Sequence, residues 1–118
     1  MAKKANAYRK KSLVMSLALI VIAGSGAIAA QSPAALYSEK CAACHGDSGK
    51  GDGPAGQTMT PPPKPFSTAL KGRSDSWIGT VITKGGPAVG MTPAMPPHPS
   101  LSNDQVAALI LYIKGLNS

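Results

Sequence analysis

The sequence predicts a small all-α domain in which three or more short helices are joined by long loops. Two stretches, residues 33–45 and 101–118, place apolar side chains at helical spacing. A third stretch, residues 75–84, has a helical pattern that ends at the glycine pair Gly85 and Gly86. No run shows the alternation that is typical of a half-buried strand.

The first predicted helix, residues 33–45, begins after a capping residue and ends before a glycine. Ser32 is a favourable N-cap, and the proline that follows it suits the first helical position. Gly46 is a plausible terminator. Side chains at spacings of four and three line one face of this helix: Tyr37, Cys41 and Cys44.

The last helix, within residues 101–118, is the clearest element of the sequence. Ser102 and Gln105 match the capping-box pattern. Lys114 lies near the C-terminal end, where a positive charge interacts favourably with the helix dipole. The apolar face recurs at intervals of three and four residues: Val106, Leu109, Ile110 and Ile113, widened by Tyr112 and Leu116.

Long loops separate these helices. Residues 46–67 and 87–100 contain so many glycines and prolines that no regular structure is expected in them. Loops of this length are uncommon in a compact domain unless they wrap a bound group or form a site.

The first thirty residues have the three-part pattern of a secretory signal peptide. A basic start is followed by the uncharged, apolar run 13–30, which ends in small residues. Cleavage after Ala29 or Ala30 fits this pattern and leaves a domain of residues 30–118. The alternative is a retained helix, because a run of roughly 18 apolar residues could just span a bilayer.

Removal of the leader also removes most of the positive charge. The whole chain carries a net charge of +7, but from Gln31 onward seven basic and five acidic side chains remain. The balance of about +2, without interleaved basic and aromatic residues, gives no indication of nucleic-acid binding. The remaining domain has four aromatic residues and a limited core, so it needs a staple such as a disulfide, a metal or a bound group.

The two cysteines of the chain lie in the run "CAACHG", as Cys41 and Cys44, next to His45. C-x-x-C-H is the attachment pattern of c-type haem. Thiols about one helical turn apart can reach the two vinyl groups on one edge of the porphyrin, and the adjacent imidazole can bind its iron. One covalently attached haem c would supply the apolar bulk that the limited core of this domain lacks.

Two other interpretations of the cysteines remain. A redox-active pair of the thioredoxin kind would suit an exported protein, but the βαβ context of that motif is absent. A zinc site could combine the two thiols with His45 or His98, but the second cysteine pair of a typical structural zinc site is missing.

A second axial ligand could come from three methionines or a histidine: Met59, Met91, Met95 and His98. Met95 has the most favourable surroundings, because the "MPP" turn restricts its backbone and the last helix follows soon after. Met91 lies in the same loop. Met59 is expected to pack or be exposed, and His98, flanked by prolines, is expected at the surface.

Taken together, these residues resemble the class I, monohaem c-type cytochromes of bacteria. The resemblance covers roughly residues 32–116. It depends on "YSEKCAACHG", on "GDG" after the haem motif, on "ITKGG" and "GMTPAMPP", and on the last helix. It implies a small cytochrome c fold, helices and long loops wrapped round one haem, in which His45 is the proximal and Met95 the distal iron ligand.

The resemblance also implies two packing features. The first and last helices should cross, with Tyr37 opposite Leu109 and Tyr112. A proline carbonyl of the long loop should orient the proximal imidazole, and the candidates are Pro61, Pro62, Pro63 and Pro65. Trp77 either contacts a haem propionate or packs in the core, and the core is favoured.

Six-coordinate iron with histidine and methionine ligands has no open position, so the expected function is one-electron transfer and not enzymatic catalysis. The expected location is the periplasm, with anchoring to the membrane if the leader is retained. Expected partners are a cytochrome reductase, a dehydrogenase or a terminal oxidase, which dock at an exposed haem edge. Five lysines either form a ring round that edge that steers acidic partners or are scattered solubilising charges: Lys40, Lys50, Lys64, Lys71 and Lys84. The alternatives are a haem subunit of a dehydrogenase or oxidase complex and a haem peroxidase with a labile distal ligand.

Overall fold

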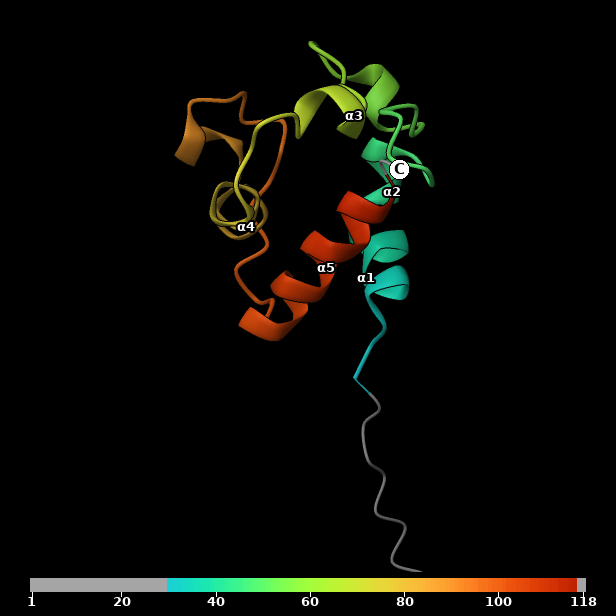
Figure 1. Cartoon of the computed structure of the whole chain (residues 1–118). Helices are drawn as coiled ribbons and strands as arrows, with labels where there is room; N and C mark the ends of the chain where they lie inside the picture. Colours follow the sequence, from blue (N-terminus) through green and yellow to red (C-terminus); the bar gives the residue numbers. More distant parts are fainter. Residues whose placement is uncertain (1–29, 117–118) are drawn as a thin grey trace, which may run out of the picture.

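The computed structural model describes residues 30–116 of the chain, and Figure 1 shows its helices and loops. The predicted leader, residues 1–29, lies outside this part. Between residues 30 and 116 there are five α-helices and no strand, which confirms the all-α prediction. The helices are α1 Pro33–Lys40, α2 Ala42–His45, α3 Phe66–Ala69, α4 Asp75–Lys84 and α5 Asn103–Gly115. None of them is long and apolar enough to cross a membrane.

The predicted first helix is divided into α1 and α2. Its cap is as expected, because the Ser32 hydroxyl accepts a hydrogen bond from the Ala35 N–H at 3.2 Å. At Cys41 the backbone leaves the helical region, with φ −124° and ψ −40°. The Cys41 N–H still donates to the Tyr37 carbonyl, and the Cys41 carbonyl accepts from His45, each at 2.9 Å. Backbone hydrogen bonds therefore continue across the break.

The two long loops contain short helical turns that the sequence analysis did not predict. A 3₁₀ turn spans Gly56–Thr58, α3 begins at Phe66, and a second 3₁₀ turn spans Gly86–Val89. Single turns of this kind need only three or four residues between the breaking glycines and prolines. The expectation that residues 46–67 and 87–100 lack regular structure was therefore wrong at these positions.

The last helix is capped as predicted. The Ser102 hydroxyl accepts from the Gln105 N–H at 3.2 Å, and the Gln105 side chain accepts from the Ser102 N–H at 2.9 Å. The expected apolar face is buried along its length: Val106, Leu109, Ile110 and Ile113. Burial of this face against the rest of the domain, more than intrinsic propensity, is what stabilises a helix of this length.

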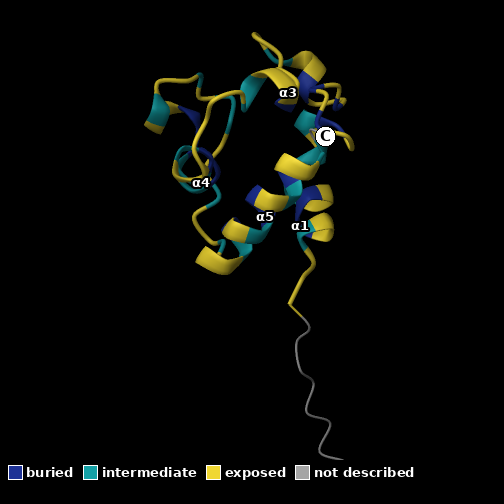
Figure 2. Cartoon of the chain, in the orientation of Figure 1, coloured by how far each residue is buried: buried dark blue, intermediate teal, exposed yellow. Residues whose placement is uncertain are grey.

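The core lies where α1 and α5 meet. The rings of Tyr37 and Tyr112 have centroids 5.3 Å apart, and Leu109 is 0 % exposed within the same apolar cluster. Figure 1 shows α5 passing obliquely beside α1, and Figure 2 shows buried positions on both helices, with others on α4 and near α3. The prediction that the first and last helices cross, with Tyr37 packed against the last helix, is therefore confirmed.

The helix α4 packs along a different side of α5. A Cβ atom on Gly79 would lie 3.6 Å from the side chains of Val106 and Ile110, so the two helices are in van der Waals contact there. Lys114 Nζ also lies 2.7 Å from Asp75 Oδ1, but both side chains are about half exposed, and such a pair contributes only about 0–1 kcal/mol. Apolar packing therefore holds α4 in place.

The loop that follows α2 is folded back on it. The Gly51 N–H donates to the His45 carbonyl at 2.8 Å, and the Ala55 N–H donates to the Ala43 carbonyl at 2.9 Å. A Cβ atom on Gly53 would lie 2.4 Å from the Ala43 carbonyl oxygen, so only glycine permits this approach. The loop therefore fixes the turn that contains the cysteines.

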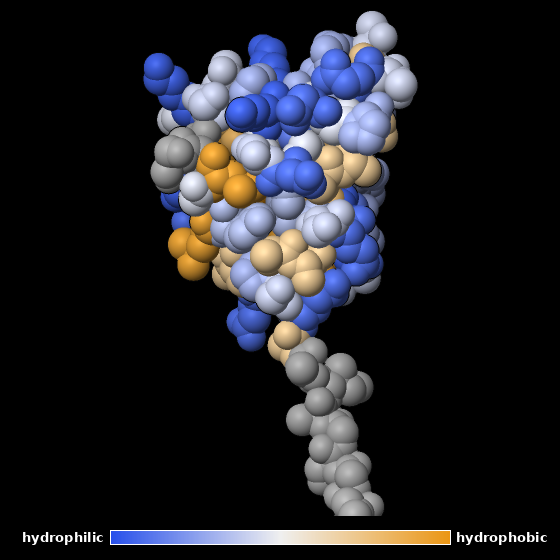
Figure 3. Space-filling view, turned by 90° about the vertical axis from the view of Figure 1, so that its right-hand side faces the viewer, coloured by the Kyte–Doolittle hydropathy of each residue, from blue (hydrophilic) through white to orange (hydrophobic). Residues whose placement is uncertain are grey.

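The face shown in Figure 3 is largely hydrophilic, and its hydrophobic residues form small separate patches. Among large hydrophobic side chains of residues 30–116, only Met91 and Leu111 are markedly exposed, at 43 % and 70 %. Isolated apolar side chains of this kind are normal on a protein surface.

Two leucines of α5 provide a matched test of where the core lies. We expect Leu109→Ala to lower the free energy of unfolding by about 2–5 kcal/mol, because the cavity it leaves cannot collapse fully. Leu111→Ala should change it by less than about 0.5 kcal/mol, because that side chain is 70 % exposed. Urea unfolding of the purified protein measures both values, and equal effects would contradict this description of the core.

Candidate functional site

An apolar cavity of about 460 Å³ lies between four parts of the chain. Its walls come from residues 40–45, from the proline-rich segment 59–64, from residues 68–77 and from the segment 91–98. Cofactor sites usually measure roughly 300–1,000 Å³ and are lined mostly by apolar groups. The cavity therefore has the size and character of a site for a substantial apolar ligand.

Both thiols line this cavity. Cys41 and Cys44 are half-buried and are not joined to each other. The pKa of Cys41 is raised to about 11, mainly by burial and slightly by Cys44, while the charge of Lys40 acts in the opposite direction. The Cys41 thiol is therefore protonated at neutral pH, unlike the thiolate of a reactive redox cysteine.

The imidazole of His45 lies beside the thiols and stacks on Phe66, with ring centroids 4.8 Å apart and an angle of 27° between the planes. Burial lowers its pKa, so the ring is neutral at pH 7. Phe66 is held in turn, because its N–H donates to the Gly49 carbonyl at 2.9 Å and its ring covers the Gly49 Cα. The ring orientation of His45 is thus fixed by stacking.

No proline carbonyl orients this imidazole, contrary to the expectation for Pro61, Pro62, Pro63 and Pro65. His45 Nδ1 is buried and has no hydrogen-bond partner within residues 30–116. The Pro63 carbonyl faces Gly51, where a Cβ atom would lie 2.2 Å from it. A buried polar atom without a partner costs about 1–3 kcal/mol. Hydrogen bonding within the protein therefore does not explain why the His45 ring is buried at this position.

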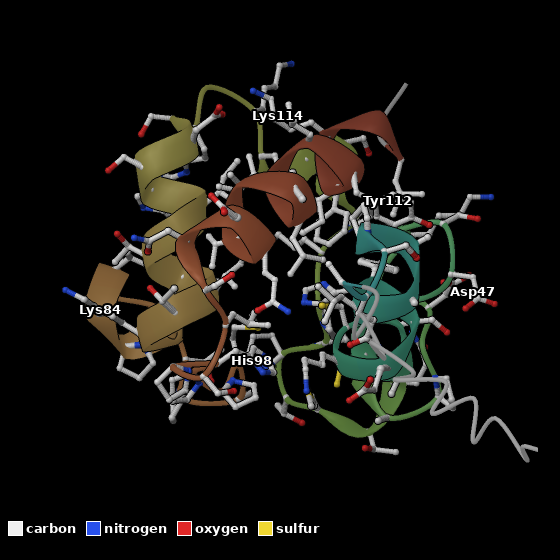
Figure 4. The ribbon with its side chains drawn as sticks, turned by 90° about the horizontal axis from the view of Figure 1, so that it is seen from below. Asp47, Lys84, His98, Tyr112 and Lys114 are labelled. Carbon is white, nitrogen blue, oxygen red and sulfur yellow. The ribbon has the colours of Figure 1, made fainter. Side chains whose placement is uncertain are left out.

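The other candidate donors line the cavity from two further segments, 59–64 and 91–98. Met91 and Met95 both line the cavity, as the sequence analysis expected of a distal loop. Met59 and His98 also line it, and both are half-buried. This agrees with the expectation that Met59 packs or is exposed, whereas His98 is less exposed than the expected surface residue. Figure 4 shows His98 between the end of α4 and helix α1.

The backbone around Met95 is anchored to the end of α4. The Gly86 N–H donates to the Met95 carbonyl at 3.0 Å, and the His98 N–H donates to the Ile82 carbonyl at 2.9 Å. Gly85, at φ +82°, brings the two segments together, since a Cβ atom there would lie 3.1 Å from the Met95 carbonyl oxygen. The segment 91–98 is therefore a rigid wall.

Three cations, and no acidic residue, line the cavity: Lys40, Lys64 and Arg73. The Arg73 guanidinium lies 4.3 Å from the centroid of the Trp77 ring, a cation–π arrangement. Trp77 both packs against the core and lines the cavity, so the two roles considered for it are compatible. The sequence analysis did not identify Arg73 as a site residue. Its position four residues before Trp77 could have indicated the contact between the two side chains.

The same cavity also brings together what a haem requires. The two thiols and a neutral imidazole come from residues 40–45, the thioethers of Met91 and Met95 come from the segment 91–98, and the cations beside them could pair with carboxylates. The apolar lining suits a flat aromatic ring. The residues present therefore fit a covalently attached haem. Within residues 30–116 no three side chains of the histidine, cysteine, aspartate or glutamate types gather as a metal site, which does not favour zinc.

Comparisons with known proteins agree with this description. No curated protein and no solved structure matches the chain. The family model described as "Cytochrome c" matches residues 30–117, nearly all of the domain described above. Proteins of this family carry a covalently attached c-type haem and transfer electrons. The chain belongs to the cytochrome c family.

Proposed function

We propose that this protein is a one-electron carrier whose haem is attached through Cys41 and Cys44 and whose iron is bound by His45 and Met95. The observation that carries the proposal is that all four side chains line one apolar cavity, three of them from residues 40–45 and Met95 from the segment 91–98. The haem supplies a single iron that alternates between the ferrous and ferric states. The protein supplies the anchors, the two donors and the exclusion of water.

Different contacts hold each of the two proposed iron ligands in position. His45 is presented by the α2 turn and held against Phe66, whereas Met95 is presented by a segment fixed to α4. A site closed by two protein donors leaves no position for a substrate, which favours electron transfer over catalysis. A thioether donor also stabilises ferrous iron and so raises the reduction potential.

Met95 is favoured over Met91 by its burial and its anchoring. Met91 is 43 % exposed, while Met95 is half-buried and its carbonyl accepts a hydrogen bond from Gly86. A donor that must stay bound in both oxidation states needs a backbone that does not move. Two prolines after Met95 restrict that backbone further.

The proposed partners are a cytochrome reductase, a dehydrogenase or a terminal oxidase with an acidic docking face. The cations beside the cavity favour such partners, although Lys40 is partly neutralised by Glu39 at 3.1 Å. The proposed location is the periplasm. Support for it is the pattern of residues 1–29 and the C-x-x-C-H motif, and neither depends on the described structure.

The two methionines of the distal loop provide a direct test of the ligand assignment. The oxidised protein should show a weak near-infrared absorption band that arises from bonding between methionine sulfur and ferric iron. We expect Met95→Ala to abolish this band and Met91→Ala to retain it. Loss of the band in the Met91 variant, with retention in the Met95 variant, would assign the ligand to Met91 instead.

The proposed leader can be tested on protein recovered from a bacterial host that exports and matures c-type cytochromes. We expect N-terminal sequencing to begin at Ala30 or Gln31, because the small residues before them fit a signal-peptidase site. A protein recovered from the membrane fraction with the first thirty residues intact would support the retained-helix alternative.

A further inference from the structure

The cavity contains a nitrogen donor that the proposed function does not use. His98 is half-buried and lines the same wall as Met91 and Met95. Of the side chains that line the cavity, only His45 and His98 carry an imidazole. His45 belongs to a different segment of the lining, so His98 is the one imidazole that the methionine segment 91–98 contributes to the cavity.

The position of His98 does not depend on the Met95 side chain. Both anchors of the segment are backbone hydrogen bonds, from Gly86 to the Met95 carbonyl and from His98 to the Ile82 carbonyl. Prolines on both sides of His98 fix φ near −65° at positions 96, 97 and 99, which limits the freedom of the segment. Removal of the thioether therefore leaves the imidazole in the cavity wall.

The charge state of His98 also suits a metal donor. Burial lowers the pKa of His98, and the positive charge of Lys40 lowers it further, so the ring is neutral at pH 7. Neutral imidazole is a common ligand of iron in proteins, whereas a thioether is a softer donor. Where both can reach ferric iron, the imidazole is a competent substitute.

We propose that His98 is a reserve axial donor that binds the iron when the Met95 thioether is not bound. The exchange breaks one iron–sulfur bond and forms one iron–nitrogen bond, with no electron or proton transferred. This inference rests on the proposed ligation by His45 and Met95. Its consequence is that loss of Met95 gives a closed iron of lower potential and not an open site that could react with peroxide.

The test uses the haem-loaded protein with Met95 replaced in two ways. Met95→Leu keeps the side-chain volume and Met95→Ala does not. An effect seen in the alanine variant alone would therefore come from lost packing and not from the lost iron ligand. In both variants we expect a low-spin, six-coordinate spectrum without the near-infrared methionine band, and a lower reduction potential. A second substitution, His98→Asn, should convert each variant to high-spin iron and raise its affinity for added imidazole at least tenfold.

The matched control is Met91→Ala in the Met95→Leu background, which should leave the low-spin spectrum unchanged. A high-spin Met95→Leu protein, or a low-spin form that survives His98→Asn, would overturn the proposal. If the unsubstituted protein shows the methionine band and Met95→Leu is high-spin, the ligation by Met95 stands and only the reserve role of His98 is excluded. If the unsubstituted protein lacks the band, the ligand assignment and the reserve role fail together.

Discussion

The domain is arranged around an apolar cavity that must be filled. Ten buried apolar side chains form the core, mainly where α1, α4 and α5 meet, and the cavity lies between segments outside that core. A domain of this size buries a limited part of its surface, so water in such a cavity would leave much apolar area exposed. Filling the cavity with a bound group joins four separate segments into one packed unit.

Backbone contacts, more than side chains, hold the walls of this cavity in position. On one side, the loop after α2 is bonded to the Ala43 and His45 carbonyls and approaches so closely that Gly53 tolerates no side chain. On the other side, the Met95 segment is bonded to the end of α4 at Gly85 and Gly86. Under the proposed ligation, backbone contacts on both sides would limit changes in geometry between oxidation states, as electron transfer requires.

Local signals were sufficient for much of the fold and for one wall of the site. The capping residues Ser32 and Ser102, the apolar face of α5 and the extent of α4 follow from spacing and propensity alone. The thiols and His45 follow from a five-residue motif. The crossing of the first and last helices followed from the family resemblance, and the contact of Tyr37 with Tyr112 agrees with it.

Features that depend on segments far apart in the sequence could not be predicted. Nothing near Cys41 indicates that the helix breaks there, and nothing near His98 indicates that its ring reaches the cavity. The expectation of a proline carbonyl at His45 was wrong, since His45 Nδ1 has no hydrogen-bond partner within residues 30–116 and the Pro63 carbonyl lies against Gly51. These features depend on tertiary packing, and patterns over a few neighbouring residues give no information about it.

The central claim is that a haem bound through both thiols fills the cavity. Mass spectrometry of a proteolytic digest of the exported protein tests it most directly. The account predicts that the peptide containing Cys41 and Cys44 carries the added mass of one haem, with no free thiol left to alkylate. A peptide of unmodified mass, whether it holds two free thiols or a disulfide, would contradict the account.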